Sequence, residues 1–108
     1  FRLMRADRGR FCFPEVNIRI PFTTVSNAIA HLLPNKQALR TMMLTGAAYT
    51  GTECFDNGIV DVLYDVDLLQ TASFEMAQKL ALKDRVTFAS IRNLMRSDIA
   101  THLTHLTQ

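Results

Sequence analysis

In residues 7 to 21, which read DRGRFCFPEVNIRIP, one carboxylate stands among apolar side chains: Glu15 follows Phe13 and Pro14 and precedes Val16. A charged carboxylate is costly to hold in apolar surroundings unless another group pairs with it. A titratable side chain placed at that cost is a candidate for acid–base chemistry. We therefore take Glu15 as the first candidate catalytic residue. A loop glutamate that only accepts hydrogen bonds from nearby backbone N–H groups is its alternative.

The residues around Glu15 predict two short strands. Residues 1–6 alternate as a strand does, and residues 10–13 resume an extended pattern after the turn residues 7–9. A hairpin-like corner and a crossover both satisfy this pattern. Pro14 has no N–H for a sheet ladder, so we expect the second strand to end there and to release Glu15 and its successor into a loop.

Helices dominate the rest of the chain. Apolar residues recur there at spacings of three and four, and Ser, Thr, Asn and Asp stand at the expected starts. We expect helices over residues 24–33, 36–44, 50–56 or 52–56, 68–83, and from 85 onward with a break at 97–98. Residues 59–64, rich in β-branched side chains, predict a third strand. Three short strands and at least five helices indicate an uneven α/β fold.

Composition excludes several classes of protein. The chain has 108 residues, 48% of them hydrophobic, which suits one domain or a large part of one. Its 12 basic and 10 acidic side chains are scattered, which disfavours nucleic acid as a partner. No apolar run reaches the ~18 residues of a membrane span, and no signal-peptide pattern opens the chain. We expect an intracellular protein.

No side chains show the spacing of metal ligands. His102 and His105 lie three residues apart on an expected helix, but no third ligand completes a site, and we interpret them as a solvated helix end. Arg85, Arg92 and Arg96 recur at helical spacing. A solvent-facing row is the interpretation that we favour for these arginines, with a basic stripe as the alternative.

Four motifs follow one another along the chain: MRADRG at 4–9, PEVNI at 14–18, MLTG at 43–46 and NGIVD at 57–61. In this order and approximate spacing they resemble the second half of the crotonase superfamily, the enoyl-CoA hydratases and isomerases. Ala81 and the FASIR run at 88–92 resemble the Δ3-Δ2-enoyl-CoA isomerases in particular. The resemblance implies the C-terminal part of a crotonase (ClpP-like spiral) fold. Its α/β core, with the catalytic-carboxylate loop, would cover residues 1–65, and a helical trimerisation region residues 66–108.

By this resemblance, the chain belongs to an enzyme that acts on fatty acyl-CoA thioesters, and an isomerase is preferred to a hydratase. Glu15 stands at the position of the catalytic carboxylate, which would remove a proton from C2 of a 3-enoyl thioester and return one at C4 while backbone N–H groups hold the enolate oxygen. Ile18, Ile20 and Phe22 are the expected substrate contacts. No metal or redox cofactor is implied, since CoA is part of the substrate. The expected partners are like chains in a homotrimer or hexamer. The resemblance also implies a cytoplasmic location in a bacterium and a peroxisomal or mitochondrial one in a eukaryote.

The sequence departs from the family pattern in two ways. Arg19 stands where the family usually has a glycine that permits close approach of a ligand, and the loop to Pro21 is slightly shorter than usual. In the family, the oxyanion hole and most of the CoA site precede the segment that this chain resembles. We therefore expect a C-terminal fragment that is catalytically incomplete by itself. The alternative is a non-catalytic, crotonase-like fragment that acts as an oligomerisation or interaction module through residues 68–108.

Overall fold

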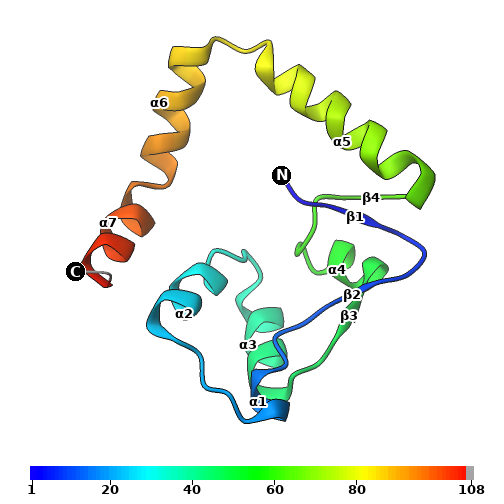
Figure 1. The fold of residues 1–108 in the computed structure, drawn as a ribbon, viewed down its shortest axis with the longest axis vertical. Helices are drawn as coiled ribbons and strands as arrows, with labels where there is room; N and C mark the ends of the chain where they lie inside the picture. The colour runs from blue at the N-terminus through cyan, green and yellow to red at the C-terminus, as the bar shows by residue number, and fades with distance from the viewer. Residues whose placement is uncertain (107–108) are drawn as a thin grey trace.

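Two pairs of short strands form the sheet structure of this computed structural model, which describes residues 1–106 (Figure 1). β1 (Leu3–Arg5) lies parallel to β4 (Val62–Tyr64), and β2 (Arg10–Phe11) lies antiparallel to β3 (Tyr49–Thr50). β1 and β2 belong to different pairs. The segment between them is therefore a crossover and not a hairpin. The sequence predicted three of these strands and missed β3 as a separate strand.

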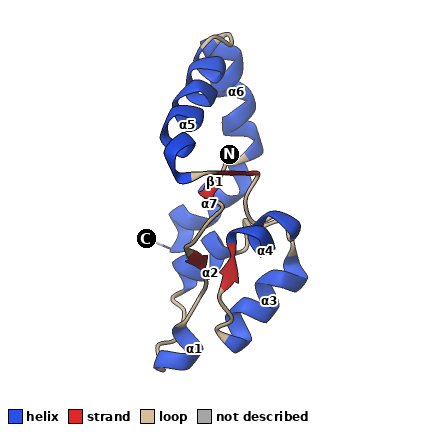
Figure 2. Cartoon of the chain, turned by 90° about the vertical axis from the view of Figure 1, so that its right-hand side faces the viewer, coloured by secondary structure: helices blue, strands red, loops and turns tan. Residues whose placement is uncertain are grey.

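Seven helices complete the described chain: α1 (Glu15–Ile18), α2 (Thr24–Ala30), α3 (Lys36–Thr45), α4 (Gly51–Asp56), α5 (Val66–Ala81), α6 (Arg85–Met95) and α7 (Ser97–Leu106). Figure 1 shows α5 and α6 running out from the strands and returning through α7 to α2, which α7 contacts. Figure 2 shows α5 and α6 at one end of the molecule and α1 at the other. The molecule is flat, measuring 44 × 41 × 20 Å. Of the helices described, none is both long and apolar enough to cross a membrane.

Side-chain caps fix where the central helices begin. The Thr23 side chain accepts a hydrogen bond from the backbone at the start of α2, and Asn35 does the same for α3. Thr50, not Thr52, opens α4: its hydroxyl accepts from the Glu53 N–H, and the Glu53 carboxylate accepts from the Thr50 N–H, both at 3.2 Å. These caps confirm the expectation that Thr and Asn side chains stand at helix starts, and the helix expected from residue 50 or 52 begins after Thr50.

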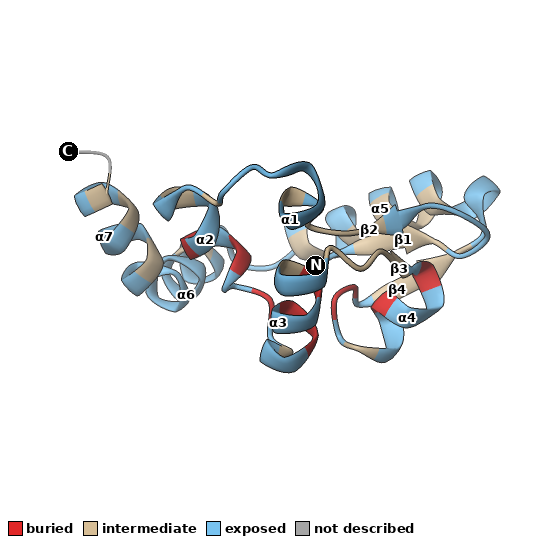
Figure 3. Ribbon diagram, turned by 90° about the horizontal axis from the view of Figure 1, so that it is seen from below, coloured by how far each residue is buried: buried red, intermediate tan, exposed pale blue. Residues whose placement is uncertain are grey.

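The core lies where α2, α3, α4 and the segment before β4 meet (Figure 3). Its buried residues are Ala30, Leu33, Leu39, Met42, Cys54, Ile59 and Val60. Burial raises the pKa of the Cys54 thiol, and the neighbouring Glu53 charge adds to this effect. Cys12, the other free cysteine, is half-buried. No residue of α5, α6 or the described α7 is buried, so these helices lie outside the core.

Helix α2 and strand β4, like the two strands before them, are shorter than the sequence predicts. α2 ends at Ala30 and not at residue 33, because the chain tightens into i to i+3 hydrogen bonds ahead of Pro34. β4 begins at Val62 and not at residue 59. The backbone N–H groups of Ile59 and Val60 both donate to the Cys54 carbonyl, at 2.8 and 3.3 Å, so these two residues fold back on α4 before the strand starts.

Met42 and Leu44 lie on α3 but differ in burial, at 0% and 70% exposed. We expect Met42→Ala to lower the free energy of unfolding by about 2–5 kcal/mol, because it leaves a cavity in the core. Leu44→Ala removes a similar apolar volume from the surface and should change stability by less than about 0.5 kcal/mol. Urea unfolding followed by circular dichroism measures both. Equal losses in the two variants would contradict this packing of α3.

Candidate functional site

Glu15 opens a one-turn helix, so the prediction that it and Val16 lie in a loop is wrong. Pro14 occupies the N-cap of α1 with φ −80°. Its carbonyl accepts hydrogen bonds from the N–H groups of Asn17, at 2.9 Å, and Ile18, at 3.2 Å. The fixed φ of proline suits the start of a helix as well as the end of a strand. Pro14 therefore ends the extended segment after β2 and begins the turn that carries Glu15.

Glu15 lines a cleft of about 450 Å³ between the β2 segment and α2, which we call the Glu15 cleft. One wall consists of aromatic side chains that come before α1 and before α2, and the other of aliphatic side chains from α2 and the turn that follows it. The two walls contain Phe11, Phe13, Phe22, Ile29, Leu32 and Leu33. Arg2 and Ser26 also line the cleft. A largely apolar cleft with few polar groups is typical of small-molecule sites.

Three phenylalanine rings form the aromatic wall. The centroids of Phe11 and Phe13 are 5.4 Å apart with the rings at 82°, and those of Phe13 and Phe22 are 5.6 Å apart at 64°. Edge-to-face pairs of this kind hold one another in place beyond simple burial. Phe22 thus lies at the cleft, where a substrate contact was predicted. Ile18 and Ile20 do not line it: both side chains are more than half exposed.

One oxygen of the Glu15 carboxylate, Oε2, is buried and accepts no hydrogen bond from any described residue. Two other carboxylates, those of Glu53 and Asp61, have backbone partners. Glu53 completes the cap of α4, and Asp61 Oδ2 accepts from the Arg2 N–H at 2.7 Å. An unpaired buried polar atom costs about 1–3 kcal/mol, so it calls for a reason. Of these three carboxylates, that of Glu15 is the one with a buried oxygen that no described residue pairs.

Arg19 ends α1 in the left-handed conformation, with φ 60° and ψ 37°. It is the only non-glycine residue with positive φ among the described residues. Glycine adopts this conformation readily, whereas other residues do so at a cost of about 1 kcal/mol. The backbone therefore has the form that a glycine would favour at the position where the crotonase pattern has one.

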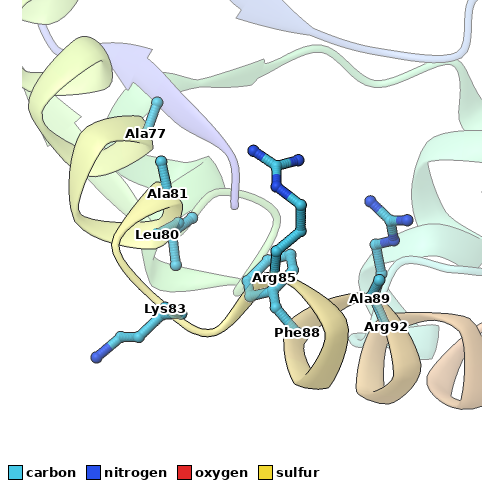
Figure 4. A pocket seen from close by; sticks show the side chains of 8 residues that line it. All are labelled: Ala77, Leu80, Ala81, Lys83, Arg85, Phe88, Ala89 and Arg92. Carbon is cyan, nitrogen blue, oxygen red and sulfur yellow. The ribbon is translucent and has the colours of Figure 1, made fainter.

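A second pocket, of about 270 Å³, lies at the corner between α5 and α6. Lys83, Arg85 and Arg92 line it together with the Phe88 ring (Figure 4). Figure 4 shows the Arg85 and Arg92 side chains extending in the same direction and Lys83 pointing away. Arg96 is not part of the lining, and all four basic residues are exposed. This arrangement agrees with the solvent-facing row that we favoured for the arginines.

His102 and His105 are exposed on α7. Within residues 1–106, no three His, Cys, Asp or Glu side chains gather closely enough to hold a metal ion.

Comparison with known proteins identifies the fold. No protein-family model and no curated protein matches the sequence. Among solved structures, an enoyl-CoA hydratase/isomerase family protein from Pseudomonas syringae superposes with a TM-score of 0.89 at 17% identity, over 98% of this chain and 46% of that one. A probable enoyl-CoA hydratase from Mycobacterium tuberculosis H37Rv gives 0.84 at 16% identity, over 92% and 42%. An enoyl-CoA hydratase from Mycobacterium paratuberculosis gives 0.74 at 17%, over 98% and 49%.

The chain thus spans less than half the length of these proteins. The predicted fold class is confirmed: a part of the crotonase fold with few short strands and a helical end. Likeness at these identities establishes the fold, and the activity has to be argued from the site.

The unpaired oxygen predicts a trade-off between stability and chemistry at Glu15. Glu15→Leu replaces the carboxylate with an apolar side chain and removes the buried unpaired atom, so we expect the free energy of unfolding to rise by up to about 1 kcal/mol. Glu53→Leu is the matched control and should lower it by about 1 kcal/mol, because it breaks the cap of α4. Urea unfolding measures both. A loss of stability in Glu15→Leu as large as that in the control would contradict the assignment.

Proposed function

We propose that this chain forms the acid–base part of an enoyl-CoA isomerase that acts on fatty acyl-CoA thioesters, with Glu15 as the proton carrier. The observation that carries the proposal is the Glu15 carboxylate in an apolar cleft, with one buried oxygen that no described residue pairs. The fold shared with enoyl-CoA hydratase/isomerase proteins supports the substrate class. The resemblance of Ala81 and residues 88–92 to the Δ3-Δ2 isomerases favours isomerisation over hydration.

The proposed reaction moves one proton and needs no redox step. The Glu15 carboxylate removes a proton from C2 of a 3-enoyl thioester, and the electrons of the C2–H bond form a double bond between C1 and C2 as the carbonyl oxygen becomes an enolate. The C3=C4 electrons then take a proton from Glu15 at C4. The double bond moves to C2=C3, the carbonyl is restored, and Glu15 is again a carboxylate. One group therefore serves both steps.

The apolar walls suit this chemistry. The phenylalanine rings and the α2 side chains exclude water, which would otherwise protonate the enolate and solvate the carboxylate. Backbone N–H donors must still bind the enolate oxygen, and such donors contribute about 10²–10³ in rate each. The proposal places these donors outside residues 1–108, in the full-length protein. Activity should accordingly be measured on that protein.

Turnover of 3-enoyl-CoA by the full-length protein tests the role of Glu15. Glu15→Gln keeps the shape of the side chain but cannot take up the proton, so we expect kcat to fall by about 10²–10⁴. Glu53→Gln, which retains an acceptor for the cap of α4, should leave turnover near that of the unsubstituted protein. Formation of 2-enoyl-CoA is followed by absorbance and chromatography. An unchanged rate in Glu15→Gln would remove this residue from the mechanism, and addition of water to 2-enoyl-CoA without isomerisation would identify a hydratase.

A second candidate function, self-association, rests on the exposed apolar side chains of the C-terminal helices. Val86, Leu94 and Met95 on α6 are all exposed, as is Leu82 just before it. Apolar side chains left uncovered at this density mark interaction surfaces. We propose that this surface joins like chains into a homotrimer or hexamer. A non-catalytic crotonase-like interaction module would use the same surface.

Sedimentation of the full-length protein at micromolar concentration tests this surface. We expect a trimer or hexamer, and we expect Leu94→Glu to shift it to smaller species because a carboxylate would be buried in the interface. Asn93→Glu adds the same charge at the neighbouring exposed position and serves as the control. A monomer in the unsubstituted protein would contradict the proposal. Self-association without any turnover of acyl-CoA would favour the non-catalytic module.

A further inference from the structure

The helix that carries Glu15 cannot hold itself in place. α1 has four residues, none of them buried, and no side-chain cap at its start. Helices this short are unstable in isolation, because the conformational entropy lost in forming the first turn exceeds the stabilisation from the hydrogen bonds of that turn. α1 packs against α3, whose residues Leu39 and Met42 are buried in the core. The position of the Glu15 carboxylate therefore depends on how α1 is attached to α3.

Asn17 of α1 packs against Gly46, the residue that ends α3. A Cβ atom added to Gly46 would lie 2.8 Å from Asn17 Cγ and 3.3 Å from Asn17 Oδ1, and it would overlap Asn17 Nδ2. The side-chain carboxamide of Asn17 thus occupies the space that any other residue at position 46 would need. A Cβ at position 46 would therefore have to displace this carboxamide.

Gly46 is itself fixed relative to the core. Its backbone has φ 70°, and its N–H donates to the Met42 carbonyl at 2.8 Å. Because the Met42 side chain is fully buried, the end of α3 offers α1 a rigid surface. Within α1, hydrogen bonds join the Asn17 N–H to the Pro14 carbonyl, at 2.9 Å, and the Ile20 N–H to the Glu15 carbonyl, at 3.0 Å. The turn therefore moves as one unit, and a displaced Asn17 displaces Glu15.

We propose that Asn17 is a positioning residue. The side-chain carboxamide of Asn17 packs against Gly46 and thereby fixes where the Glu15 carboxylate lies in the cleft. Asn17 itself does not line the cleft. The catalytic consequence of the contact rests on the proposed function, whereas the attachment of α1 to α3 does not.

Gly46→Ala and Gly58→Ala form a matched pair for the test. Both glycines have nearly the same positive φ, at 70° and 69°, so both substitutions carry the same backbone cost. A Cβ at Gly58 meets only Pro34 Cγ, at 4.0 Å, whereas a Cβ at Gly46 displaces Asn17. In the full-length protein, Gly46→Ala should lower kcat for 3-enoyl-CoA by about 10²-fold, the cost of a misplacement of about 1 Å. KM should change little, and Gly58→Ala should keep kcat near that of the unsubstituted protein.

Asn17→Ala supplies the decisive comparison. As a single substitution, Asn17→Ala removes the contact with Gly46 and should lower kcat. Combined with Gly46→Ala, it removes the side chain with which the new Cβ would collide. The double variant should therefore turn over faster than Gly46→Ala alone. Losses that simply multiply in the double variant would overturn the proposal, because two independent structural defects give that result. If Gly46→Ala does not fold, Asn17→Ala alone tests the proposal, because Asn17 is exposed and its substitution should leave the fold intact. Unchanged turnover in Asn17→Ala would also overturn the proposal.

Amide hydrogen exchange separates this inference from the proposed function. Exchange at the Ile20 N–H reports whether the α1 turn is held. It should quicken in Asn17→Ala and in Gly46→Ala, but not in Gly58→Ala. If the unsubstituted protein shows no isomerase turnover, the proposed function fails, and this exchange pattern still tests the attachment. Exchange that responds equally to Gly46→Ala and Gly58→Ala would refute it.

Discussion

Burial of one face of α3 is the constraint on which the rest of the structure depends. Met42 and Leu39 are almost completely removed from solvent and pack with Cys54 and Ile59 from the α4 region. Because α3 is fixed in this way, its C-terminal end can hold α1 at Gly46. The turn before its N-terminal end, at Leu33, contributes both to the core and to the Glu15 cleft. The geometry of the cleft is thus set by apolar packing that does not itself touch a ligand.

The segment that carries Glu15 is the least favourable part of the described structure. Glu15 has a buried oxygen without a protein partner, and Arg19, at the other end of the same turn, has a positive φ. Each feature costs free energy, and such costs persist only where surrounding structure imposes them. They occur together on a turn with no buried residue. The concentration of these two costs on one turn favours a functional role for this turn over a purely structural one.

Sequence patterns predicted the helix ends that are fixed by hydrogen bonds between residues close together in the chain. Asn35, Thr50 and Gly46 mark helix ends through hydrogen bonds to residues three or four positions away, and α3 and α4 were predicted almost to the residue. α1 was missed because Pro14 can end a strand or start a helix, and the packing of α1 against α3, which is distant in sequence, is not visible in the local pattern. The pattern of a strand does not identify its partner, so the pairing of β1 with β4 had no sequence signal.

The candidate site was predicted less completely than the fold, because neighbours in sequence are not neighbours in the cleft. The turn of α1 carries Ile18 to the surface, whereas Phe11 and Ile29 reach the cleft from β2 and α2. The alternation of Phe11 and Phe13 was the available signal, since residues two apart in an extended segment share a face.

Periodicity likewise predicted α5 and α6 correctly, but it gives the direction of an apolar face and not what covers it. In this chain the apolar side of α6 remains exposed, while α7 contacts α2, the helix that forms one wall of the Glu15 cleft. A partner bound to the exposed surface of α6, as proposed for self-association, would be connected to the cleft through α7, which contacts both α6 and α2.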